Sequence, residues 1–123
     1  MKSTMQSTIR VTVDAAYAFD MYSIAEIKST EINSNDSYLR LALLEKEITD
    51  QIGRENFLYV FNSKEYRDLS EANCIVWEMV KASKDNEVTA KEVDEANYQR
   101  HVTKIALQKR FFASGLTEEK KRD

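Results

Sequence analysis

Proline is absent from the chain, and glycine occurs only at Gly53 and Gly115 among 123 residues. At average usage a chain of this length would contain about six prolines. Proline interrupts helices, and glycine supplies the positive φ angles that tight turns and hairpins need. A β-sandwich or β-barrel needs many such turns, so this composition favours long helices. The scarcity of glycine also excludes a glycine-rich phosphate-binding loop and the nucleophile elbow of α/β-hydrolases.

Cysteine and histidine occur once each, as Cys74 and His101. A single cysteine cannot form an intrachain disulfide, which is compatible with a reducing, cytoplasmic location. A single histidine excludes a zinc site built from several histidines within one chain. We expect Cys74 to be a small buried residue beside the apolar stripe of its helix.

Long apolar runs and a strong charge imbalance are also missing. No apolar stretch reaches the ~18 residues of a membrane-spanning helix, and residues 1–8 lack the apolar region of a signal peptide. The formal net charge of −3 does not indicate a chain that binds nucleic acid as a whole or mimics DNA. We therefore expect a cytoplasmic protein that has no membrane partner.

The length of the chain suits one domain that buries about two thirds of the surface exposed by the unfolded chain. Hydrophobic residues make up 42% and charged residues 32%, as in a core surrounded by ion-rich helices. We expect one helical domain over residues 1–116, with Gly115 and Leu116 ending the last helix in a Schellman motif. The almost entirely charged residues 117–123 are expected to form a flexible tail.

The first two helices are predicted from apolar residues at helical spacing. One covers about residues 14–32, with Asp14 as its N-cap. The next covers residues 37–52, and Gly53 follows it as a C′ residue.

Two further helices are predicted mainly from their capping signals. The third starts near Ser63, where Asn62 and Glu65 have the spacing of a capping box. The fourth starts with the full capping box of Thr89 and Glu92.

Two short segments leave the fold class open. Residues 9–13 alternate between apolar and polar, which fits either a short strand or an upstream extension of the first helix. Residues 57–61, FLYVF, are continuously apolar, which fits either a short buried strand or the first turn of the next helix. Short connections between helices favour antiparallel neighbours. We expect an all-α fold of about four helices in an antiparallel, bundle-like arrangement, with a short N-terminal strand as an option. The alternative is an α+β fold in which segments 9–13 and 57–61 pair.

The basic end of the predicted fourth helix is a candidate site for nucleic acid or another polyanion. Its cations are Arg100, Lys104, Lys109 and Arg110, followed by two phenylalanines. Basic residues beside aromatic rings can bind phosphates and stack bases. The helix also starts with acids and ends with bases, which the helix dipole favours without any ligand. The dipole explanation is the stronger of the two.

Two acidic pairs form a weaker candidate for a magnesium site. Glu65 with Asp68, and Glu92 with Glu95, each project from one face of a helix. All-α nucleotide pyrophosphohydrolases use such pairs to hold magnesium, but the order of the ExxD and ExxE pairs here is the reverse of the one expected. The chain has 21 acidic residues, so such spacings also arise by chance, and we infer neither membership of that family nor a cofactor.

Aromatic and other apolar residues cover more than one side of the predicted first helix. This indicates either a central helix or one that also packs on a partner. The second interpretation makes the chain a non-enzymatic helical interaction or assembly module, an accessory protein that binds itself or another protein. The expected interface comprises Tyr17, Phe19, Met21, Tyr22, Phe57, Tyr59 and Phe61.

Overall fold

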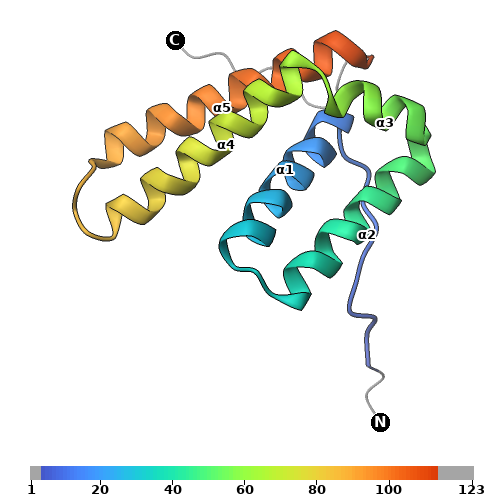
Figure 1. Cartoon of the computed structure of the whole chain (residues 1–123), viewed down its shortest axis with the longest axis horizontal. Coiled ribbons are helices and arrows are strands. Elements are labelled where there is room, and N and C mark those ends of the chain that lie inside the picture. The colour runs from blue at the N-terminus through green and yellow to red at the C-terminus, as the bar shows by residue number, and fades with distance from the viewer. Residues whose placement is uncertain (1–3, 114–123) are drawn as a thin grey trace.

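The computed structural model describes residues 4–113 (Figure 1). It contains five helices, which are α1 (Ala15–Glu31), α2 (Asn35–Ile52), α3 (Arg54–Phe61), α4 (Lys64–Ser83) and α5 (Ala90–Phe111). The described residues contain no strand, so the all-α prediction is confirmed and the α+β alternative is wrong. Residues 9–13 are neither helix nor strand, and residues 57–61 belong to α3.

The helices form two antiparallel hairpins of different length (Figure 1). α1 and α2 make the shorter hairpin, α4 and α5 make the longer one, and α3 connects the two. α1 packs against α2, α4 and α5, so it occupies the centre of the fold. The end of the longer hairpin that carries the α4–α5 loop projects away from α1 and α2 (Figure 1). Among the described residues, no helix is long and apolar enough to cross a membrane.

The short helix α3, which the sequence did not predict, is separate from α2 because the chain turns sharply at Gly53. This residue has φ +89° and donates its backbone N–H to the Thr49 carbonyl oxygen at 2.9 Å, which closes α2. The positive φ is a conformation that residues with a side chain rarely adopt. The FLYVF segment then continues as α3, in which Phe57 and Val60 are buried on one face. The prediction of about four helices missed this short one because an apolar run of five residues carries no clear periodicity.

The capping predictions had mixed outcomes. α4 is capped by Ser63, whose hydroxyl accepts the Tyr66 backbone N–H at 3.1 Å. The predicted capping box of Asn62 and Glu65 is therefore wrong by one position, because the chain enters the helix one residue later.

The start of α5 follows its prediction closely. The Thr89 hydroxyl accepts the Glu92 N–H at 3.2 Å, and the Glu92 carboxylate accepts the Thr89 N–H at 3.0 Å. Asp14 is the N-cap residue of α1, as expected, although its side chain makes no capping hydrogen bond. The predicted Schellman motif at Gly115 and Leu116 and the tail over residues 117–123 lie outside the described residues.

Aromatic rings dominate the core at the place where α1, α3 and α4 meet the end of α5. Phe19 is 1% exposed, and its ring centroid lies 5.7 Å from that of Phe57, 6.1 Å from that of Tyr66 and 6.2 Å from that of Phe112. Residues from all five helices join the same apolar cluster. Phe19 on the central helix therefore ties together elements that are far apart in the sequence.

Candidate functional site

The cations at the end of α5 include Arg100, which is paired inside the protein. The Arg100 guanidinium contacts both carboxylate oxygens of Asp20, through Nη2 at 2.7 Å and Nε at 3.2 Å. Asp20 is 1% exposed and also accepts a hydrogen bond from the Asn73 amide at 3.0 Å. The hydrogen bond from Arg100 to Asp20 is the main reason why the pKa of Arg100 is raised above its ordinary value. Arg100 therefore joins α5 to α1, and its charge is already compensated inside the protein.

Two further cations of this group also have partners within the chain. Lys104 Nζ lies 5.3 Å from the centroid of the Tyr17 ring. Arg110 Nε lies 4.0 Å from a carboxylate oxygen of Glu65, and its guanidinium carbon is 4.7 Å from the centroid of the Phe111 ring. Neither contact removes the positive charge, since a tyrosine ring carries no opposite charge and the side chain of Arg110 is 51% exposed.

The two acidic pairs lie at opposite ends of the α4–α5 hairpin and do not face each other. The ion pair of Glu65 with Arg110 places the start of α4 beside the end of α5, whereas Glu92 is in the first turn of α5. α5 has 22 residues, or about 33 Å at 1.5 Å per residue. One magnesium ion cannot bridge that distance.

Each acid of the two pairs also has a local partner. The partners are Arg110 for Glu65 (4.0 Å), Lys64 for Asp68 (2.7 Å), Thr89 for Glu92 (3.0 Å) and Gln99 for Glu95 (3.2 Å). Among residues 4–113, no group of three or more histidine, cysteine, aspartate or glutamate side chains is placed to hold a metal ion.

Three residues of the expected aromatic interface are core residues. Phe19, Tyr22 and Phe57 are buried by the chain's own helices, so in this fold they are not available to a partner. α1 is apolar on several sides because it is the central helix, which was the other interpretation of its pattern.

The remaining members of that set differ in exposure. Met21 and Phe61 are partly buried and pack against the core, whereas Tyr17 and Tyr59 are exposed. Tyr59 makes an edge contact with the Phe111 ring at a centroid distance of 5.3 Å. These two tyrosines are the most exposed members of the expected interface.

The sequence analysis missed an exposed apolar surface on α2. Leu39 is 68% exposed and Leu43 is 52% exposed, whereas Leu44 and Ile48 on the same helix are buried. Nine residues separate Leu39 from Ile48, which is roughly two and a half helical turns, so the two side chains point in opposite directions. We name the exposed residues Tyr38, Leu39, Ala42 and Leu43 the α2 outer face.

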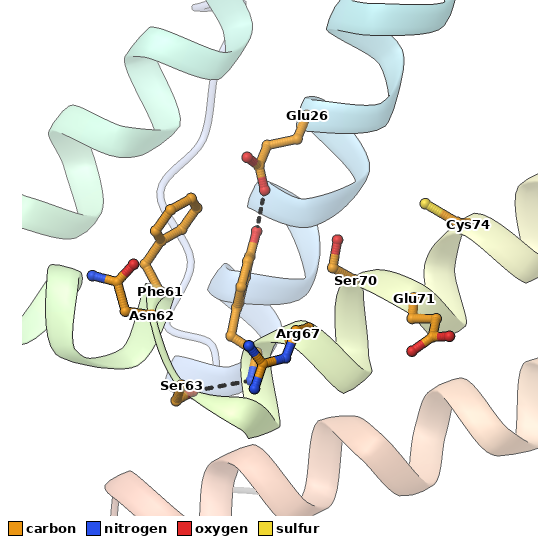
Figure 2. A pocket seen from close by; sticks show the side chains of 9 residues that line it. Glu26, Phe61, Asn62, Ser63, Arg67, Ser70, Glu71 and Cys74 are labelled. Carbon is orange, nitrogen blue, oxygen red and sulfur yellow. Dashed lines mark hydrogen bonds between the residues drawn. The ribbon is translucent and has the colours of Figure 1, made fainter.

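A pocket of about 520 Å³ lies between α1, the end of α3 and the first half of α4. Figure 2 shows Glu26 projecting from α1 into the pocket, Phe61 at the end of α3, and Ser70 and Cys74 along α4. The Tyr66 hydroxyl donates a hydrogen bond to Oε1 of Glu26. Burial is the largest cause of the raised pKa of Glu26, and it outweighs the opposing effect of this hydrogen bond.

Cys74 is exposed at the edge of this pocket, so the expectation that it is buried is wrong. Desolvation by its partial burial is the largest cause of its raised pKa, and neighbouring glutamates, Glu31 first among them, raise it further. The thiol is therefore held in its neutral form, which is the less nucleophilic one.

Comparison of the chain with protein-family models, with curated proteins and with solved structures finds no match.

Proposed function

We propose that this chain is a non-enzymatic helical assembly module, and that two copies associate through the α2 outer face. The observation that carries the proposal is that α2 is apolar on two opposite sides. One side supplies Leu44 and Ile48 to the core, while Leu39 and Leu43 on the other side are more than half exposed. Contiguous exposed apolar surface of this kind is typical of sites where proteins interact.

The position of α2 supports this choice of surface. α2 packs mainly against α1 and α3, and the side chains of Leu39 and Leu43 remain more than half exposed. Leu39 and Leu43 are four residues apart and form one row along the helix. Two such rows can pack against each other about a twofold axis, and each copy then buries the same residues of the other. The ion pair of Lys46 with Asp50, at 2.6 Å, would lie at the polar rim of this contact.

The decisive measurement is the mass of the protein in solution by size-exclusion chromatography with light scattering. We expect the wild type to form a dimer, and the double variant Leu39→Lys with Leu43→Lys to be monomeric because two buried charges would face each other across the contact. At concentrations low enough for the wild type to be monomeric, the same two substitutions should leave helicity and stability nearly unchanged, since both side chains are exposed in the single chain.

A matched control replaces Val80 and Val102, which are exposed on the other hairpin, with lysine. That variant should keep the mass of the wild type. A monomeric wild type at high micromolar concentration, or a dimer that survives the α2 substitutions, would refute the proposal.

The other two functions considered from the sequence gain no support from the geometry. Polyanion binding is less favoured than it was from the sequence, because buried Asp20 compensates the charge of Arg100. Magnesium-dependent hydrolysis is disfavoured because the acidic pairs are about a helix length apart. The proposed module needs no cofactor, and its single cysteine suits a cytoplasmic location.

A further inference from the structure

The pocket between α1 and α4 contains the carboxylate of Glu26, for which the described part of the chain supplies a hydrogen bond from Tyr66 but no ion pair. The charge of Glu45 acts on Glu26 as well and favours the protonated form. A half-buried carboxylate in this situation is stabilised in its charged form by a cation that reaches it from outside.

The remaining surface of the pocket suits a flat cation. The partly buried ring of Phe61 lines the pocket and packs against Tyr66 at a centroid distance of 5.2 Å; because Tyr66 is only 4% exposed, Phe61 is the more accessible aromatic face. Aromatic faces attract cations, and a guanidinium group can stack on them while donating hydrogen bonds from its edge. Ser70 and Glu71 on α4 add oxygen acceptors to the lining. Arg67 also lines the pocket, and Figure 2 shows its side chain away from the carboxylate of Glu26.

We propose that this pocket binds the guanidinium group of an arginine side chain presented by a partner protein. Guanidinium fits better than a lysine ammonium because it is planar, more weakly hydrated and able to combine stacking with hydrogen bonds to a carboxylate. The pocket, of about 520 Å³, is open to solvent on one side, so a side chain carried on the backbone of a partner can reach it from outside. Arginine anchored in a pocket is a common energetic centre of protein interfaces.

This site is separate from the α2 outer face, since no residue of α2 lines the pocket. The two proposals therefore have different readouts. Association through α2 changes the mass of the particle, whereas the pocket changes the affinity for a cation. Either proposal can fail while the other holds.

The test is a titration of the ¹⁵N-labelled full chain with N-acetylarginine amide, followed by ¹H–¹⁵N NMR at constant ionic strength. We expect saturable shifts that centre on Tyr66, Ser70 and Cys74, with weak affinity because a single side chain is offered. N-acetylcitrulline amide has nearly the same shape without the charge, and it should bind at least about tenfold more weakly.

Two variants make the result specific. Glu26→Gln keeps an oxygen that can accept the Tyr66 hydrogen bond but removes the charge, so binding should weaken about tenfold. Ser70→Lys places a permanent cation in the pocket and should abolish binding. The control Glu47→Gln removes an exposed carboxylate of α2 and should bind as the wild type does. Equal affinity for the citrulline compound, or undiminished binding by both pocket variants, would overturn the proposal.

Discussion

Arg100 on α5 and Asp20 on α1 are 80 positions apart in the chain and form a two-point ion pair. The shorter of the two contacts is 2.7 Å, and the aspartate is almost completely buried. Asn73 on α4 donates one amide group towards both Asp20, at 3.0 Å, and Ser23, at 3.2 Å. One buried carboxylate therefore links the central helix to both helices of the longer hairpin.

Removing the arginine should destabilise the fold strongly. Arg100→Met leaves the Asp20 charge buried without its partner, and we expect a loss of about 3 kcal/mol in the free energy of unfolding. Urea denaturation followed by circular dichroism measures the loss. Lys91→Met, which removes an exposed cation of the same helix, is the control and should change stability by less than about 0.5 kcal/mol. A similar result for both variants would show that the ion pair contributes little.

Substituting a buried and an exposed leucine tests which side of each helix faces the core. Leu69 is completely buried, whereas Leu39 on the α2 outer face is mostly exposed. We expect Leu69→Ala to cost about 3 kcal/mol, because the truncation leaves a cavity that the packed helices cannot fill. Leu39→Ala should cost less than about 1 kcal/mol when unfolding of the monomer is measured at low concentration. Comparable losses at both sites would contradict the assigned orientation of α2.

The start of α4 can be tested with adjacent substitutions. Ser63 provides the capping oxygen for the Tyr66 N–H, so Ser63→Ala should cost about 1 kcal/mol of stability. Asn62→Ala removes an exposed side chain that does not serve as the N-cap and should change stability much less. A larger effect at Asn62 than at Ser63 would instead support Asn62 as the N-cap, as the sequence predicted.

Glu26 should make the stability of the protein depend on pH. Its pKa in the folded state is raised above the ordinary value of 4.5, first by burial and then by the charge of Glu45. The folded state therefore binds this proton more tightly than the unfolded state, so its stabilising contribution is fully present below pH 4.5 and is lost as the pH rises through the raised pKa. Chemical denaturation of the wild type and Glu26→Gln between pH 4 and pH 8 measures this. The variant should lose stability less steeply than the wild type across that range; parallel curves would contradict the expectation.

Local signals in the sequence were sufficient to predict most of the helices. The capping box of Thr89 and Glu92 formed as expected. The absence of proline correctly indicated a helical fold, and Gly53 correctly indicated the end of α2. These signals succeed because a cap or a positive φ depends on hydrogen bonds and sterics within a few residues. The same locality explains the misassigned cap at Asn62, since adjacent polar residues offer equivalent chemistry to the first turn.

Only the tertiary structure decided what the side chains of those helices do. The basic residue Arg100 and the aromatic residues Phe19 and Tyr22 looked available to a ligand or partner, but Asp20 compensates the first and the core buries the other two. The exposed row of Leu39 and Leu43 became distinguishable from the buried side of α2 only once that helix was packed. The physical reason is that the sequence shows which side chains are apolar or charged, but not which groups bury or neutralise them. Those groups are often distant in the chain or on another molecule.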